Sequence, residues 1–287
     1  MNALVIGATG LVGSHVARTL AQAGSVVGTG LTRADSAITP LDIRDAAAVR
    51  RLVDAVRPDV IVCAAAEPHV DLCEREPERT RAVNVAGVEH VAAAARAVAA
   101  RLVYFSSDYV FDGKTGAYAE DAPVSPLNEY GRQKVEAERI VRQLNDSLVL
   151  RVSGVFGVDD RRKNFVYQVI DRLRAGEPVQ APDDQTLCPT WASDIADTVG
   201  ELLRLGFSGV CHVVGPDALV RVDFARRIAA AFDLDAGKIA AVPFAASAGA
   251  APRPACSSLS DARLRGLVGH GLTPVAEALQ ALRAAGL

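Results

Sequence analysis

The chain of 287 residues has no uninterrupted apolar run of the ~18 residues that a membrane-spanning helix needs, and no basic segment precedes its first apolar residues. It also has no excess of positive charge, because 31 Lys and Arg against 34 Asp and Glu give a formal net charge of −3. General electrostatic attraction to nucleic acid or to anionic membranes is therefore absent. We expect a small-molecule partner, with no nucleic acid and no membrane.

Cysteine and histidine are sparse, and neither forms a motif. The five cysteines are an odd number without a C-x-x-C pair, and none of the five histidines stands at a metal-ligand spacing. This pattern predicts reduced thiols in a cytoplasmic protein, with no disulfide framework and no metal site. The cysteines are Cys63, Cys73, Cys188, Cys211 and Cys256.

Short apolar runs alternate with helical patterns over the first 150 or so residues. Buried strands are expected at 4–6, 26–27, 60–62, 102–105 and 148–150, and helices at 11–23, 45–57, 78–99 and 128–144. Strands without polar alternation, separated by connections of helix length, are typical of a parallel sheet covered on both faces. The predicted fold class is α/β, a doubly wound parallel sheet of the Rossmann type.

The regular alternation of strand and helix patterns ends after Arg151. Helices are expected near 164–175, 192–204, 222–232 and 274–285, and a strand at 209–214. A proline-rich stretch occupies 178–189, and the prolines of 251–258 indicate a loop. We therefore expect residues 1–150 to form a nucleotide-binding domain. Residues 151–287 are expected to form mainly a smaller substrate-binding lobe, interleaved with the last strands of the sheet.

A glycine turn follows the first strand. Gly7, Gly10 and Gly13 form G-x-x-G-x-x-G at the start of a helix, where glycine lets the backbone approach a pyrophosphate and the helix amides meet its charge. The pattern alone is weak, but it stands here at the first strand of a βαβ unit. It predicts a dinucleotide site.

The choice between NADP and NAD depends on the end of the second strand. Arg33 is present there and no acidic residue precedes Asp35, which favours the 2′-phosphate of NADPH and leaves NADH as the alternative. Asp42 and Ile43 are expected beside the adenine. The small residues Ala64, Ala65 and Ala66 end a strand along which a cofactor can lie.

Tyr130 and Lys134 supply Y-x-x-x-K at the start of an expected helix, and a spacing of four puts both on one face. A tyrosine has an ordinary pKa near ~10, and a neighbouring ammonium is expected to lower it. The stretch SSDYVFDG at 106–113 follows a buried strand and, taken alone, is more typical of a polar turn. With the glycine turn before it and Y-x-x-x-K after it, Ser107 becomes the candidate for orienting a substrate carbonyl.

These motifs occur together with several longer ones: GATGLVG, LDIRD, YFSSDYVFDG, SPLNEYGRQK, KNF, DDQTLCPTWASDIAD and RPACSSLSDARL. With them the chain resembles the extended short-chain dehydrogenase/reductases, and among these the dTDP-4-dehydrorhamnose reductase group, nearly end to end. The resemblance implies reduction of a nucleotide-linked 4-keto sugar. The pro-S hydride of NADPH would go to the keto carbon while Tyr130 donates the proton.

The resemblance also implies a set of site residues. Ser107 stands where the family usually has threonine. The catalytic set is Ser107, Tyr130 and Lys134. The cofactor set is Gly7, Thr9, Gly10, Leu11, Val12, Gly13, Arg33, Asp42, Ile43, Ala64, Ala65, Ala66, Asn84, Tyr130, Lys134 and Ser153, and the substrate set is Val70, Asp71, Ser107, Asp108, Tyr109, Asn164, Gln185, Thr190 and Arg253.

The chain departs from the family pattern at Gly154, where many reductases of the group have tryptophan, so the sugar itself is left open. Alternatives also stay open. A sugar epimerase or dehydratase of the same superfamily is one, although Asp108 is followed by Tyr109 and not by the glutamate of the 4,6-dehydratases. A non-catalytic NADP-binding protein is another, because the chain also resembles the regulatory β subunit of methionine adenosyltransferase. The sequence leaves open whether the chain forms a homodimer.

Overall fold

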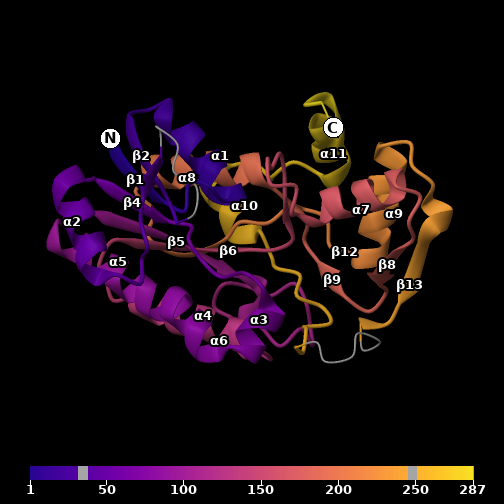
Figure 1. Cartoon of the computed structure of the whole chain (residues 1–287), viewed down its shortest axis with the longest axis horizontal. Helices are drawn as coiled ribbons and strands as arrows, with labels where there is room; N and C mark the ends of the chain where they lie inside the picture. The colour runs from indigo at the N-terminus through magenta and orange to yellow at the C-terminus, as the bar shows by residue number, and fades with distance from the viewer. Residues whose placement is uncertain (32–37, 245–250, 287) are drawn as a thin grey trace.

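A seven-stranded sheet forms the centre of the protein. The computed structural model describes residues 1–31, 38–244 and 251–286. The strand order is β11-β6-β5-β4-β1-β2-β3, and every neighbouring pair is parallel (Figure 1). This confirms the expected doubly wound parallel sheet. The strands are β1 (Asn2–Ile6), β2 (Ser25–Gly30), β3 (Ile38–Pro40), β4 (Val60–Cys63), β5 (Arg101–Ser107), β6 (Ser147–Val152) and β11 (Gly209–His212).

Helices cover both faces of this sheet because successive strand side chains point to opposite sides. In β1, Leu4 and Ile6 pack with α2 (Ala46–Val56), α5 (Val88–Ala97) and α6 (Glu129–Val141). Ala3 and Val5 face the other layer, which contains α1 (Leu11–Ala21), α8 (Ala192–Arg204) and α10 (Ala262–Val268). The strands are buried on both faces, which explains their apolar sequences.

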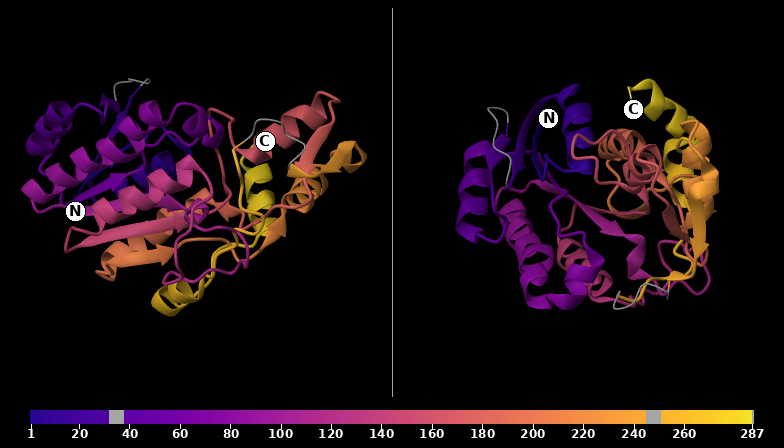
Figure 2. Two further views of the ribbon diagram at one scale, coloured as in Figure 1. Left: turned by 90° about the horizontal axis from the view of Figure 1, so that it is seen from below. Right: turned by 45° about the vertical axis from the view of Figure 1, so that its right-hand side comes forward.

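The smaller lobe lies beside the sheet and has its own apolar core, built largely from three helices (Figures 1 and 2). α8, β11 and α10 belong to the sheet side although they follow residue 151. The assignment of substrate binding to residues 151–287 stays a prediction. The lobe contains α7 (Phe165–Arg174), α9 (Arg221–Ala231), α11 (Val275–Ala284) and the strand pairs β7–β10 (Val155–Phe156, Thr190–Trp191), β9–β12 (Thr186–Leu187, Leu219–Val220) and β8–β13 (Val179–Pro182, Ile239–Val242).

The helix expected near 78–99 is confirmed, but it is not α-helical throughout. The segment forms α4 (Pro77–Arg81), a π-helical stretch at Ala82–Gly87 and then α5, and α3 (Val70–Arg75) precedes them. A π-helical turn accommodates an extra residue and changes the direction of its side chains. Gly87 also packs directly on Ile43, because a Cβ there would lie 2.6 Å from the Ile43 side chain. Neither feature leaves a periodic signal in the sequence.

A buried ion pair joins α6 to β6. Arg151 donates to Glu138 through Nε (2.9 Å) and Nη2 (2.8 Å), and each side chain is 3% exposed. Because the bidentate geometry satisfies both charges, the pair tolerates burial, whereas either member alone would be a buried uncompensated charge.

We therefore expect Glu138→Ala to lower the free energy of unfolding by about 3–5 kcal/mol, since it strands Arg151 in the interior. Asp223→Ala is the matched control. It breaks the exposed Arg226–Asp223 pair and should cost no more than about 1 kcal/mol. Urea unfolding followed by circular dichroism measures both, and equal losses in the two variants would contradict the assignment.

Candidate functional site

The glycine turn between β1 and α1 is closely packed against the end of β4. Gly7 has φ +87°, and a Cβ on it would lie 2.7 Å from the Ala65 nitrogen. A Cβ on Gly13 would lie 2.1 Å from the Gly7 carbonyl oxygen. Glycine is therefore required at both positions. The first turn of α1 carries no acidic residue, so this cradle fits the pyrophosphate of a dinucleotide.

Of the other residues expected to bind the cofactor, some lie at this turn and others do not. Leu11 and Val12 begin α1, and Thr9 packs on Gly30 at the end of β2, where a Cβ would lie 2.6 Å from Thr9 Cγ2. The carboxylate of Asp42, after β3, is paired with Arg44 at 2.6 Å. Arg33, on which the preference for NADPH was based, lies outside the described residues.

Asn84 is buried and makes its contacts within the protein. Its Oδ1 accepts from the Glu67 amide (2.8 Å), and its Nδ2 donates to the Glu67 carbonyl (3.1 Å) and to Gln133 Oε1 (2.8 Å). All of these partners are protein groups, and the expected contact of Asn84 with the cofactor stays a prediction. Asn84 is 1% exposed, and through these bonds it holds the loop after β4 against α6.

Ser107, Tyr130 and Lys134 are brought together where β5 ends and α6 begins. Lys134 Nζ donates to the Phe105 carbonyl at 2.8 Å, which ties the helix to the strand. A Cβ on Gly131 would lie 2.2 Å from the Tyr109 carbonyl oxygen, so the first turn of α6 packs on the turn after β5. The rings of Tyr109 and Tyr130 meet edge to face at 6.0 Å.

The electrostatics of this cluster differ from the expectation. Burial raises the pKa of Tyr130, and a hydrogen bond with Ser107 opposes the rise. Burial also lowers the pKa of Lys134 to about 8. The direction of the Tyr130 shift is opposite to the expected lowering of its pKa, because burial disfavours the phenolate by more than the Ser107 hydrogen bond stabilises it.

Asp108 is a buried carboxylate held by hydroxyl groups. Its oxygens accept from Ser107 (2.8 Å), Ser153 (2.8 Å) and Ser257 (2.5 Å). Burial raises the pKa of Asp108, and these bonds oppose the rise. Ser153, expected at the cofactor, directs its hydroxyl to Asp108 and accepts from the Cys188 amide (3.2 Å). Asp108 therefore joins β5, β6 and the C-terminal segment at one point.

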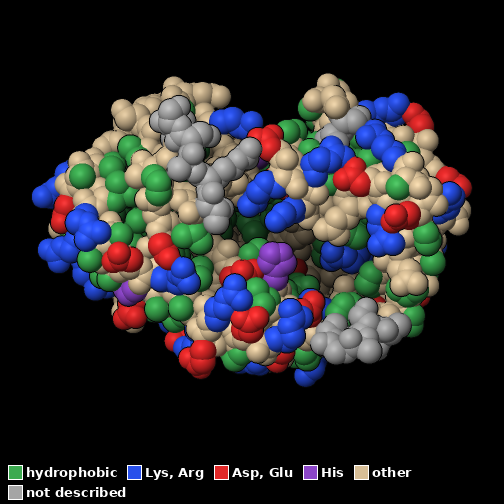
Figure 3. All heavy atoms as spheres, in the orientation of Figure 1, with side chains coloured by type: hydrophobic (Ala, Val, Ile, Leu, Met, Phe, Trp, Pro, Cys, Tyr) green, Lys and Arg blue, Asp and Glu red, His purple; other side chains and the backbone are tan. Residues whose placement is uncertain are grey.

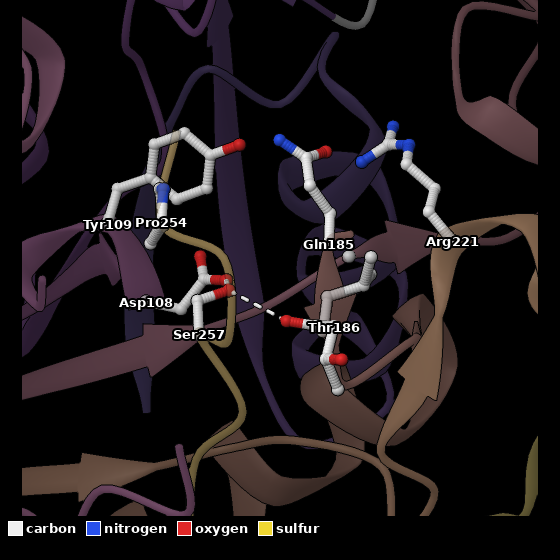
Figure 4. Close-up of a pocket in the computed structure, with 9 residues that line it drawn as sticks. Asp108, Tyr109, Gln185, Thr186, Arg221, Pro254 and Ser257 are labelled. Carbon is white, nitrogen blue, oxygen red and sulfur yellow. Dashed lines mark hydrogen bonds between the residues drawn. The ribbon is translucent and has the colours of Figure 1, made fainter. Parts of the chain in front are cut away.

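A small pocket opens beside Asp108, in the hollow between the sheet and the smaller lobe (Figure 3). Tyr109, Gln185 and Arg221 lie along one side of it, and Asp108 and Ser257 lie below (Figure 4). Its volume of ≈ 80 Å³ suits one part of a larger ligand. It is lined by Asp108, Tyr109, Gly154, Gln185, Thr186, Leu187, Arg221, Pro254 and Ser257.

Arg221 was missed by the sequence reasoning, as was Ser257. Among the described residues the Arg221 guanidinium has no hydrogen-bond or ion-pair partner, and it lies over the Phe165 ring at 4.5 Å. Burial lowers its pKa, and Asp108 opposes this. The sequence signal that could have found Arg221 is its position as the first residue of a helix, directly after the apolar pair Leu219-Val220. Ser257 lies in the motif that contributed only Arg253 to the expected set.

Two expected substrate residues, Asp71 and Arg253, contact each other. Arg253 Nη2 donates to Asp71 Oδ2 at 3.0 Å, and Asp71 Oδ1 accepts from the Ala251 amide at 2.9 Å. Val70 begins the same helix, α3. The pair leaves Arg253 partly neutralised.

Two further expected substrate residues have internal partners. Thr190 is completely buried, donates to the Cys188 carbonyl (2.9 Å) and accepts from the Gly215 amide (3.1 Å). Its expected contact with substrate stays a prediction. Asn164 donates to the Gly157 carbonyl (3.0 Å) and thereby closes the loop before α7. Gln185 alone of these more distant positions lines the pocket.

All five cysteines are free, as expected. Within residues 1–31, 38–244 and 251–286, no cluster of three or more His, Cys, Asp or Glu is placed to bind a metal ion. No helix in the described part of the chain has both the length and the apolar character to cross a bilayer.

The internal role of Asn84 predicts that Asn84→Ala destabilises the protein without any ligand. Losing a buried amide that satisfies several polar groups should cost about 1–3 kcal/mol. Asp42→Ala, at a half-buried expected cofactor position paired with the exposed Arg44, should change the stability by no more than about 1 kcal/mol. Urea unfolding of the ligand-free proteins measures both, and an Asn84→Ala variant with unchanged stability would refute the internal role.

Comparison with known proteins gives three informative relatives. The chain is 37% identical to the probable low-salt glycan biosynthesis reductase Agl14 of Haloferax volcanii, over 99% of this chain and 98% of that one. It is 34% identical to the dTDP-4-keto-6-deoxy-D-glucose reductase of Streptomyces niveus, over 95% and 92%. It is also 35% identical to the methionine adenosyltransferase 2 subunit beta of Xenopus tropicalis, over 88% and 78%.

Solved structures agree with this grouping. The dTDP-4-dehydrorhamnose reductase of Bacillus anthracis in complex with NADP superimposes with a TM-score of 0.87 at 26% identity, covering 99% of this chain and 98% of that one. The family model described as RmlD substrate binding domain matches residues 1–285. The chain belongs to the RmlD substrate-binding-domain family.

Proposed function

We propose that the protein is an NADPH-dependent reductase of a nucleotide-linked 4-keto sugar, of the dTDP-4-dehydro-6-deoxyhexose type. The oxidoreductase class and the cofactor follow from the family, whose members include reductases and a structure with NADP. The observation that carries the proposal is the meeting of Ser107, Tyr130 and Lys134 at the carboxyl end of β5, beside a pocket. Parallel α/β sheets bind ligands at this edge.

Each residue has a separate task in this proposal. Bound NADPH supplies a hydride. Ser107 orients the keto oxygen, and Tyr130, whose raised pKa keeps it protonated at neutral pH, donates a proton to that oxygen. Lys134 holds a positive charge under the reacting region and binds the nicotinamide ribose. Asp108 holds Ser107 through the 2.8 Å bond between their side chains.

The substrate class is supported by the residues around the pocket. Arg221 has no partner among the described residues and faces the same space as Gln185, so it suits a phosphate oxygen. Arg253 is near enough to Arg221 for their charges to interact, and it is paired with Asp71. Two neighbouring arginines suit the diphosphate of a nucleotide sugar.

Gly154 lines the pocket at the position where many reductases of the group have tryptophan. Gly154 has φ +52°, and a Cβ there would lie 2.2 Å from Leu187 Cδ1. A tryptophan at this position would require Leu187 to move, so Leu187 takes the space where many reductases of the group have the ring. This arrangement supports a nucleotide-linked 4-keto sugar of the same class as 4-dehydrorhamnose.

The first test concerns the proton donor. Tyr130→Phe should reduce kcat for the keto sugar by about 10²–10⁴-fold, the usual size of a lost general acid, while NADPH still binds. Turnover is followed by NADPH absorbance with dTDP-4-keto-6-deoxyglucose, with and without a 3,5-epimerase.

Tyr109→Phe is the matched control, because Tyr109 is also a buried tyrosine and its ring contacts that of Tyr130. It should keep kcat within about tenfold of the wild type, since it removes a hydroxyl that does not protonate the substrate. If Tyr109→Phe loses turnover and Tyr130→Phe does not, the assignment of the donor is wrong. Tight NADPH binding by the wild type without turnover of any keto sugar favours the alternative of a non-catalytic NADP-binding protein.

The second test uses the titration of Lys134. Because burial lowers its pKa to about 8, the side chain is an ammonium below that pH and neutral above it. Tyr130 stays protonated over this range, so kcat/KM for reduction should be flat near neutrality and fall above pH 8 through the loss of the Lys134 charge.

The control is Lys134→Met, which has no titrating group there. Its residual activity should be low. Between pH 7 and about 9.5 this activity should show no decline apart from any loss of the substrate through its own instability. A decline of the wild-type profile that persists unchanged in Lys134→Met would assign the titration to another group.

A further inference from the structure

A basic side chain from the smaller-lobe side of the chain lies over the glycine turn. Arg161 belongs to the loop between β7 and α7, far from the turn in sequence. Its Nη2 is 3.8 Å from the position that a Cβ on Gly10 would occupy. Gly10 is the N-cap of α1, and α1 has no acidic residue in its first turn. A guanidinium and the positive end of a helix therefore face the same space, which favours an anion there.

The loop that carries Arg161 is held in place by several bonds. The Asp159 carboxylate accepts from the amides of Arg161 (3.1 Å) and Lys163 (3.2 Å), and the Asp159 amide donates to the Tyr167 hydroxyl (3.2 Å). Asn164 closes the loop through its 3.0 Å bond to the Gly157 carbonyl. The backbone at Arg161 is thus fixed before any ligand binds.

His15 attaches this loop to the cofactor helix. Its Nε2 lies 3.0 Å from the Val158 carbonyl, and its Nδ1 lies 3.2 Å from the Ser193 hydroxyl. Burial lowers the pKa of His15, so the ring is neutral and its Nε2 donates to the carbonyl while Ser193 donates to Nδ1. α1 and the loop are therefore joined directly.

The Arg161 guanidinium makes one long ion pair within its own loop, with Asp159. Its Nε lies 3.5 Å from Asp159 Oδ1, at the outer limit of a hydrogen bond, and its side chain is 41% exposed. Arg162, the next residue, differs in both respects. Its guanidinium is hydrogen-bonded to Asp171 and lies over the Tyr167 ring at 4.4 Å. The two neighbouring arginines thus have different surroundings.

We propose that Arg161 binds the pyrophosphate of the dinucleotide, so that the cofactor is held by α1 and by the β7–α7 loop together. This deepens the proposed function and rests on its cofactor. The arrangement makes Arg161 a ligand of the phosphates shared by NADPH and NADH, and it does not discriminate the 2′-phosphate.

The experiment is a fluorescence titration of NADPH and of NADH against the full chain, with no sugar present. Arg161→Ala should weaken binding of both nucleotides by the same factor, about tenfold, the size expected for one charge-assisted contact that is partly exposed. Arg161→Lys should recover part of this loss. Arg162→Ala, the matched control, should bind both nucleotides within about twofold of the wild type.

Three results would overturn the proposal. The first is unchanged binding of both nucleotides by Arg161→Ala. The second is a loss of affinity for NADPH alone, which would indicate that Arg161 contacts the 2′-phosphate. The third is an equal loss of affinity in Arg162→Ala, which would indicate a general effect of positive charge. Melting of the ligand-free variants confirms that they fold. Because the titration needs no sugar, failure of sugar reduction leaves its outcome unaffected.

Discussion

The bond from Lys134 Nζ to the Phe105 carbonyl, at 2.8 Å, fixes the geometry on which the site depends. It crosses from α6 to the last residues of β5, so the helix cannot slide along the strand without leaving a buried ammonium unpaired. The Lys134 Nζ also lies 4.8 Å from the centre of the Tyr104 ring, and this cation–π contact stabilises its positive charge. Through this bond Tyr130 and Ser107 become neighbours, although 23 positions separate them in the sequence.

The region around this bond contains buried polar groups that satisfy one another. Asp108 relies on serine hydroxyls from two further segments, Ser153 after β6 and Ser257 in the C-terminal part of the chain. Asn84 holds the loop after β4 in a similar way. Such networks hold one arrangement firmly when every member is paired. The site therefore draws on the whole chain, and the smaller lobe contributes to the order of the end of β5 as well as to the pocket.

The sequence predicted what depends on local pattern. Apolar runs and glycine spacing predicted the parallel sheet and the turn at Gly7–Gly13, and Y-x-x-x-K placed Tyr130 and Lys134 on one helix. What depends on burial could not be read in this way. The raised pKa of Tyr130, the internal contacts of Asn84 and the complete burial of Thr190 follow from the three-dimensional surroundings. Arg221 and Ser257 were missed because the segments that carry them are next to two-residue strands or in loops, without periodicity.

The central claim is that the cluster reduces a keto carbon by hydride transfer from the cofactor. The most direct measurement is the isotope content of the sugar after turnover with NADPH deuterated at the pro-S position of the nicotinamide. The account predicts a deuterium on the former keto carbon, C4, located by mass spectrometry and proton NMR. A product without deuterium, or with the label on another carbon, would contradict it, since an epimerase or a non-catalytic binding protein leaves the sugar without net reduction.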